Sequence, residues 1–179
     1  MIDFDFNLKQ QKEIMRLAFL YQREAKKCYF AKAYLSGCIL MGAAMEALLL
    51  STINCFPELI LDAKTAPKIK GKIKPLEKWG LGKLIAVAKE LNWLPSTLLP
   101  KDKWAIADIK TGDYFEVVQK IRNLIHPIRY AKELSRRRIT KKHLIACFNI
   151  VDNASNYLSK ALKNYILILK EEKERRTAN

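Results

Sequence analysis

Hydrophobic residues recur along most of this chain at intervals of three and four, with lysine, glutamate and glutamine between them. Such spacing places apolar side chains along one side of an α-helix. It predicts helices over about 8–28, 31–54, 81–92, 114–125 and 140–172. No stretch alternates with a period of two for long enough to indicate a sheet. The expected fold class is therefore all-α, a helical bundle of about five main helices.

The segments between the predicted helices have a different composition. Residues 57–80 contain three prolines and six lysines with little periodicity, which predicts a long basic loop after the second helix. This loop could bind nucleic acid or could be a solvated connector. A second loop is expected over 95–112, and the charged tail at 170–179 is expected to fray. The length suits a single domain spanning residues 1–179.

The second predicted helix is unusually apolar. From Ala33 to Ile53 the only charged residue is Glu46, and the segment is long enough to span a bilayer. An acid at the centre of a membrane span is costly, however, and small residues such as Gly42 suit close packing between helices. We therefore expect a central helix buried on most sides of a bundle, and no membrane partner.

The chain has 33 lysines and arginines against 18 acidic residues, a formal charge of +15. Such an excess attracts polyanions, which makes RNA, DNA or an acidic membrane surface natural partners. The alternative is a solvated lysine-rich surface. Four cysteines without a CxxC pair, and only two histidines, give no metal-site spacing, so no metal or other cofactor is expected. The N-terminus lacks the features of a secretory signal, and a cytoplasmic location is expected.

Motifs of the common enzyme classes are not found. The glycines fit neither a Walker nor a Rossmann phosphate loop, and no nucleophile signature is recognisable. Trp79, Trp93 and Trp104 lie in or near predicted loops, where they could stack on bases. Anchoring of these loops to the core is the expected role. His143, in the first turn of the last predicted helix, is expected to be a surface or capping residue.

The most informative segment covers residues 119–130, Gln-Lys-Ile-Arg-Asn-Leu-Ile-His-Pro-Ile-Arg-Tyr. Arg122 and His126 lie four residues apart at the end of a predicted helix, so both are expected on one face. Pro127 ends that helix, which puts His126 at or just past its last turn. An imidazole beside a guanidinium suits phosphate chemistry, because one group moves protons and the other holds the anion. The same pair could instead only cap the helix carbonyls.

Charged residues elsewhere add to this site. Glu46 is a lone charge on an apolar helix and needs a cationic or hydrogen-bonded partner, for which Arg122 is the first candidate. A structural salt bridge, or a protonated acid, is expected for Glu46 rather than a direct chemical role. The segment after Pro127 is basic and is predicted to contact nucleic acid. Its cationic residues are Arg129, Lys132, Arg136, Arg137 and Arg138.

Two segments together resemble bacterial members of the HEPN superfamily. They are Gly42-Ala43-Ala44-Met45-Glu46-Ala47-Leu48-Leu49 and Arg122-Asn123-Leu124-Ile125-His126-Pro127. Residues 81–85 lie where those proteins carry a similar segment, and the resemblance covers most of residues 10–165. It implies a helical bundle that in many members is a metal-independent endoribonuclease and acts as a homodimer. Other members are non-catalytic nucleotide-binding or interaction modules.

The resemblance also implies roles for individual residues in a cleft shared between two copies. His126 would act as general acid or base toward the RNA 2′-hydroxyl and the leaving oxygen, and Arg122 would stabilise the charge on the phosphate. Asn123 would bind substrate or orient His126. Three residues separate Arg122 from His126 where the family has four to six, and Lys120 could replace the arginine only imperfectly. This departure favours the alternative of a catalytically inactive module that binds nucleic acid, a nucleotide or a protein. For either function the resemblance implies a toxin–antitoxin or phage-defence system, with a cognate antitoxin protein as partner.

Overall fold

A computed structural model describes residues 6–94, 114–123, 126, 128 and 138–177. Helices account for 77% of these residues, in six α-helices, and the strands are only two residues long each. The predicted all-α helical bundle is therefore confirmed. The predicted loop over 95–112 lies outside the described residues.

The first helix, α1 (Leu8–Phe30), begins at a reciprocal side-chain cap. The Asn7 side chain accepts a hydrogen bond from the Gln10 backbone N–H at 2.9 Å, and the Gln10 side chain accepts one from the Asn7 N–H at 3.0 Å. Both contacts satisfy N–H groups that would otherwise have no intrahelical partner. Gln11, one residue further, donates to the backbone oxygen and the hydroxyl of Ser51 at 2.9 and 2.8 Å. These contacts fix the start of α1 beside the end of the second helix.

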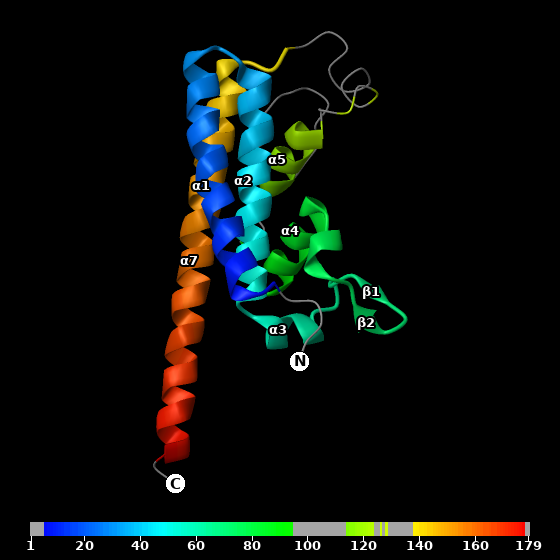
Figure 1. Cartoon of the computed structure of the whole chain (residues 1–179), viewed down its shortest axis with the longest axis vertical. Helices are drawn as coiled ribbons and strands as arrows, with labels where there is room; N and C mark the ends of the chain where they lie inside the picture. Colours follow the sequence, from blue (N-terminus) through cyan, green and yellow to red (C-terminus); the bar gives the residue numbers. More distant parts are fainter. Residues whose placement is uncertain (1–5, 95–113, 124–125, 127, 129–137, 178–179) are drawn as a thin grey trace.

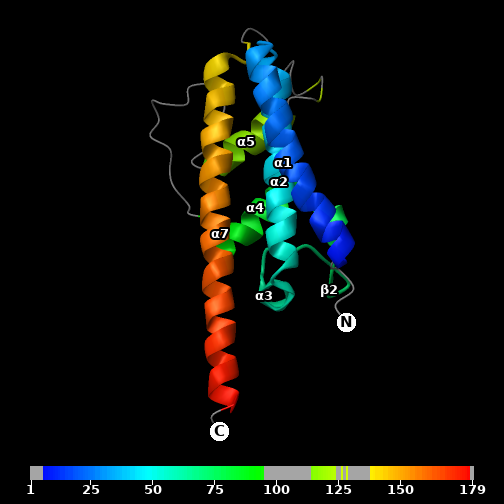
Figure 2. The ribbon, with the colours of Figure 1, turned by 60° about the vertical axis from the view of Figure 1, so that its left-hand side comes forward.

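The second helix, α2 (Tyr34–Asn54), occupies the centre of the molecule, as the sequence predicts. It packs against α1, α7 (Lys141–Thr177), α5 (Tyr114–Asn123) and α4 (Leu81–Glu90), and Figures 1 and 2 show these four helices around it. Its length and apolar composition would also suffice to cross a membrane, and 61% of its most apolar stretch is buried in the bundle. Small residues allow the close approach. Gly37, for example, lies directly against the Leu144 side chain of α7.

The segment after α2 is more regular than the predicted basic loop. It contains α3 (Pro57–Asp62), a hairpin of β1 (Lys68–Ile69) and β2 (Lys72–Ile73), and a short 3₁₀ turn, η1 (Leu76–Lys78). The segment predicted as a long basic loop over 57–80 therefore contains short regular elements. The two-residue turn between the strands uses Lys70 and Gly71, whose φ angles are 49° and 78°. Positive φ at both positions matches the right-handed twist of a tight hairpin.

Buried side chains and hydrogen bonds anchor the hairpin to the bundle. The Trp79 indole N–H donates to the Lys74 carbonyl at 2.8 Å, and Trp79 itself is buried. On the other side, the Glu90 carboxylate of α4 accepts hydrogen bonds from the Lys64 N–H at 2.7 Å and the Thr65 N–H at 2.8 Å. Trp93 is buried as well, so the predicted anchoring role is confirmed for two of the three tryptophans. Trp104 lies outside the described residues.

Helix α4 ends at Glu90, two residues earlier than predicted, and the described part of α5 ends at Asn123. The predicted buried stripe of α4 is confirmed at Leu81, Leu84, Ile85 and Ala88. On α5, Val118 and Ile121 are fully buried. The two helices pack against each other as well as against α2, and α5 also contacts α7.

The last helix, α7, has 37 residues and continues past its predicted end near 172 to Thr177. The expected fraying of the tail at 170–179 stays a prediction. The His143 imidazole accepts a hydrogen bond from the Thr140 N–H at 3.0 Å, which confirms the predicted capping role. The apolar stripe of α7 is buried down to Leu158, but Leu162, Ile166 and Leu169 are exposed. Figures 1 and 2 show why: the C-terminal part of α7 extends beyond the other helices.

Candidate functional site

The centre of the candidate site is an ion pair between α5 and α2. The Arg122 Nη2 atom donates to the Glu46 Oε2 atom at 2.9 Å. The Arg122 side chain is 32% exposed and the Glu46 side chain 20% exposed, so the pair lies at the edge of the core. The prediction that Arg122 is the partner of Glu46 is confirmed.

Glycine makes this contact possible. Gly42 lies one turn before Glu46 on α2, and a Cβ atom built there would be 2.5 Å from Arg122 Cβ and 2.7 Å from Arg122 Cγ. The base of the arginine side chain therefore rests on the backbone of α2, and its guanidinium reaches the carboxylate one turn further along. At the other edge of α5, the end of the Gln119 side chain lies against Gly82 of α4.

Burial and the ion pair act on Glu46 in opposite directions. Partial removal from water raises the pKa of the Glu46 carboxyl, and the nearby Arg122 charge lowers it by a smaller amount. The net pKa is above its ordinary value. Glu46 is thus held in place by a hydrogen bond to a cation in a site that weakly disfavours its charge.

His126 lies outside the helix that carries Arg122. The described part of α5 ends at Asn123, and the His126 backbone N–H donates to the Asn123 carbonyl at 3.2 Å. The position just past the last turn is as predicted, but the argument that a shared helical face brings Arg122 and His126 together does not apply. The His126 side chain is exposed. Within the described residues, no hydrogen bond joins it to Arg122.

The structure describes only some of the other predicted site residues. Asn123 and Lys120 on α5 are half-buried, and Arg138 is exposed just before α7. Four of the predicted nucleic-acid-binding residues lie outside the described residues: Arg129, Lys132, Arg136 and Arg137. Of the predicted site residues, the structure brings Glu46 and Arg122 into contact. Asn123 and His126 follow Arg122 in the sequence.

Two residues that contact neighbouring helices lie outside the predicted catalytic and supporting residues. Gly42 lets α5 approach α2, and Gln119 lies against α4, yet glycine in an apolar helix and glutamine on a polar edge are both common. The signal for Gly42 was its spacing of four residues from the lone charge Glu46, which puts both on one face of α2.

The arrangement suits the binding of an anion. A guanidinium carries five N–H donors, and Glu46 accepts from Nη2 only, so other donors of Arg122 can still contact a phosphate. The imidazole of His126 is exposed and therefore accessible to a substrate. Among the described residues, no three histidine, cysteine, aspartate or glutamate side chains gather in a way that could hold a metal ion.

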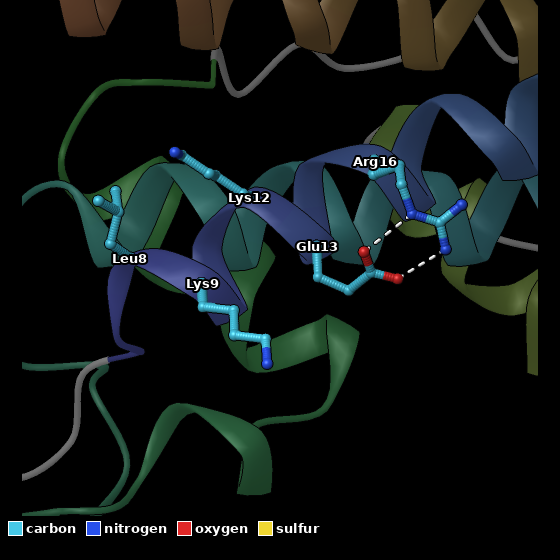
Figure 3. A pocket seen from close by; sticks show the side chains of 5 residues that line it. All are labelled: Leu8, Lys9, Lys12, Glu13 and Arg16. Atoms are coloured by element: carbon cyan, nitrogen blue, oxygen red, sulfur yellow. Dashed lines mark hydrogen bonds and ion pairs between the residues drawn. The ribbon is translucent and has the colours of Figure 1, made fainter.

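A surface hollow on α1 is a less suitable site. Figure 3 shows it bordered by Leu8, Lys9, Lys12, Glu13 and Arg16. Arg16 and Glu13 bind each other through two contacts, at 2.8 and 2.6 Å, which leaves little of either charge for a ligand. The Lys9 and Lys12 side chains point away from each other. The hollow thus lacks polar groups that converge on a ligand.

Comparison of the chain with known protein families, with functionally described proteins and with solved structures gives no match.

Proposed function

We propose that this protein acts on RNA as a HEPN-like helical protein, and that Arg122 and His126 form a site for metal-independent cleavage in a homodimer. The observation that carries this proposal is the position of Arg122. Its side chain is held by Glu46 at the edge of the core, half-exposed, four residues before an exposed histidine. A cation that is already oriented loses less conformational freedom when it binds a phosphate.

The proposed reaction is an internal transesterification. The RNA 2′-oxygen attacks the adjacent phosphorus and gives its proton to an imidazole. The bond from phosphorus to the 5′-oxygen breaks, and that oxygen takes a proton from a second group, which acts as the acid. The products are a 2′,3′-cyclic phosphate end and a 5′-hydroxyl end. Arg122 stabilises the negative charge that grows on the phosphate oxygens.

This reaction needs one base and one acid, which supports the homodimer. The sequence has two histidines, and His143 is engaged with Thr140 at the start of α7. A second copy would supply its own His126 to the cleft. A toxin–antitoxin or phage-defence setting, with an antitoxin protein as further partner, belongs to the same proposal.

A second function, binding without cleavage, is favoured by one specific contact. Glu46 offsets part of the Arg122 charge, and this weakens the pull of the guanidinium on a phosphate. The three-residue gap between Arg122 and His126 acts in the same direction, because small errors of position cost a large factor in rate. In this function the protein is a nucleic-acid-binding, nucleotide-binding or protein-interaction module.

Cleavage assays separate the two functions. The full-length protein is incubated with a mixed RNA pool in EDTA, beside the His126→Ala and Arg122→Ala variants. Loss of a general acid–base group is expected to lower the rate by about a hundredfold or more. Ile128→Ala, at an exposed residue two positions from His126, is the matched control and should cleave at the wild-type rate. Binding of RNA without any product would select the non-catalytic module, and cleavage that neither site variant alters would exclude the proposed roles.

A further inference from the structure

The hairpin of β1 and β2 carries lysines at alternate positions, Lys68, Lys70, Lys72 and Lys74. The first three are exposed, and Lys74 is half-buried. In the part of the chain that the structure describes, none of these four ammonium groups forms an ion pair with a carboxylate. The lysines therefore repel one another, and no ion pair with a described carboxylate offsets that repulsion.

Hydrogen bonds hold the base of the lysine-bearing hairpin in place. The Lys74 N–H donates a hydrogen bond to the Pro67 carbonyl at 2.9 Å, and the Trp79 indole N–H donates one to the Lys74 carbonyl. The nearby acid, Glu90, is occupied by the backbone N–H groups of Lys64 and Thr65, and these hydrogen bonds, with one from the Thr65 hydroxyl, lower its pKa. Because both ends are anchored, ligand binding needs little ordering of the backbone.

The strand register distributes the lysines over both faces of the ribbon. Lys68 pairs with Ile73, and Ile69 pairs with Lys72, so Lys68 and Lys72 point to opposite faces. Lys70 lies at the tip, and Figure 1 shows the hairpin projecting from the helices. A flat membrane surface would contact one face only. A nucleic acid has phosphates on both sides of a groove or of a folded strand, and a two-stranded ribbon is narrow enough to enter a groove.

We propose that this hairpin binds the phosphate backbone of a nucleic acid, with Lys68, Lys70 and Lys72 contacting phosphates on both faces and at the tip of the ribbon. RNA as the natural ligand rests on the proposed function, whereas binding by the hairpin does not require cleavage. Each lysine–phosphate contact releases a counterion, so the affinity falls steeply with salt.

Binding is measured with a 20-nucleotide 2′-O-methyl RNA, which lacks the hydroxyl needed for the proposed cleavage, and with a 20-base-pair DNA duplex. The variant K68Q/K70Q/K72Q is compared with K9Q/K12Q/K26Q, which removes the same charge from exposed lysines of α1. The hairpin variant should bind at least tenfold more weakly. Its plot of log affinity against log salt should be shallower by about 2 to 3, since each contact contributes roughly 0.7 to 0.9. The α1 variant should bind within about twofold of the wild-type protein.

The two nucleic acids show whether the hairpin prefers a single strand or a duplex, and a loss with either one supports the proposal. If the two triple variants lost affinity equally, the loss would reflect net charge alone, and the proposal would be overturned. Binding to anionic phosphatidylserine vesicles but to neither nucleic acid would also overturn it, as would no binding to either oligonucleotide by the wild-type protein.

The outcome is separable from that of the proposed cleavage. A protein that binds through the hairpin but leaves natural RNA intact would contradict the catalytic roles of His126 and Arg122 alone. A protein that cleaves RNA with unchanged affinity in the hairpin variant would contradict the hairpin site alone. Neither triple variant should lower the melting temperature, because none of these six lysine side chains forms a hydrogen bond or ion pair with the described residues.

Discussion

Gly42 controls how closely Arg122 approaches the central helix. The contact involves Arg122 Cβ and Cγ, which lie near the α5 backbone and cannot move without moving the helix. At Gly82 the neighbouring atoms belong to the far end of the flexible Gln119 side chain. The two glycines therefore differ in what an added methyl group would displace.

We predict that Gly42→Ala lowers the free energy of unfolding by about 1 to 2 kcal/mol, since overpacking typically costs about 1 to 3 kcal/mol and exceeds the helical gain of alanine. Gly82→Ala should change it by less than about 0.5 kcal/mol, because Gln119 can rotate away. Urea unfolding followed by circular dichroism gives both values. Equal effects of the two substitutions would show that Arg122 does not press on α2.

A second residue-scale prediction concerns His143. Burial lowers the pKa of its imidazole below the ordinary 6.5, so the folded protein binds fewer protons here than the unfolded chain does. The contribution of the neutral His143 imidazole to the free energy of unfolding is complete above pH 6.5. It is lost as the pH falls through the pKa of the folded protein. The free energy of unfolding should therefore fall between pH 7.5 and 5.5.

His143→Gln isolates this effect. Glutamine at the third helical position can still accept a hydrogen bond from the Thr140 N–H, but it does not titrate. As the pH falls, the free energy of unfolding of the wild-type protein should decrease relative to that of the variant. A pH-independent difference would contradict the lowered pKa of the half-buried imidazole. The opposite trend expected from Glu46, whose pKa is raised, cancels in this difference.

The sequence was informative about single residues where a charge lies on an apolar helix. Glu46 is the one charge of α2 and needs a partner, and Arg122, the first candidate for that partner, is the residue that pairs with it. The close contact with Gly42 could not be predicted, because it depends on the angle and distance between α2 and α5. The location of His126 relative to Arg122 also depends on where α5 ends, which helical spacing leaves uncertain by a few residues.

At the scale of elements, helical periodicity predicted the helices well, but it missed the hairpin. Its strands have only two residues each, too few for an alternating pattern to be recognised. The symmetric run Lys-Ile-Lys-Gly-Lys-Ile-Lys around the Lys70–Gly71 turn was the signal that could have found it. Periodicity also gave no warning that the apolar stripe of α7 continues beyond its neighbours, since exposure depends on tertiary structure.

The two halves of α7 should differ in stability. Residues 144–158 pack into the core, whereas Leu162, Ile166, Leu167, Ile168 and Leu169 are 37 to 56% exposed. Backbone amides over 144–158 should exchange with solvent at least about a hundredfold more slowly than those over 162–171. Hydrogen exchange at low micromolar protein measures this directly. Equal protection along α7 would mean that the projecting part is covered in solution.

The whole molecule combines a bundle built around α2 with two polar features on its periphery. One is the Arg122–Glu46 pair with the exposed His126 after it, and the other is the anchored lysine hairpin. A net charge of +15 draws polyanions to the molecule as a whole. The hairpin would supply much of the binding energy, and the end of α5 would supply the chemistry.

The most direct test of this account is chemical rescue of His126→Ala. Because the His126 side chain is exposed, free imidazole can reach its place in the altered protein. In EDTA, the variant should cleave RNA at about one hundredth of the wild-type rate or less. Its rate should rise in proportion to added imidazole, with 2′,3′-cyclic phosphate ends on the products. Cleavage by His126→Ala at the wild-type rate, with or without imidazole, would contradict the account.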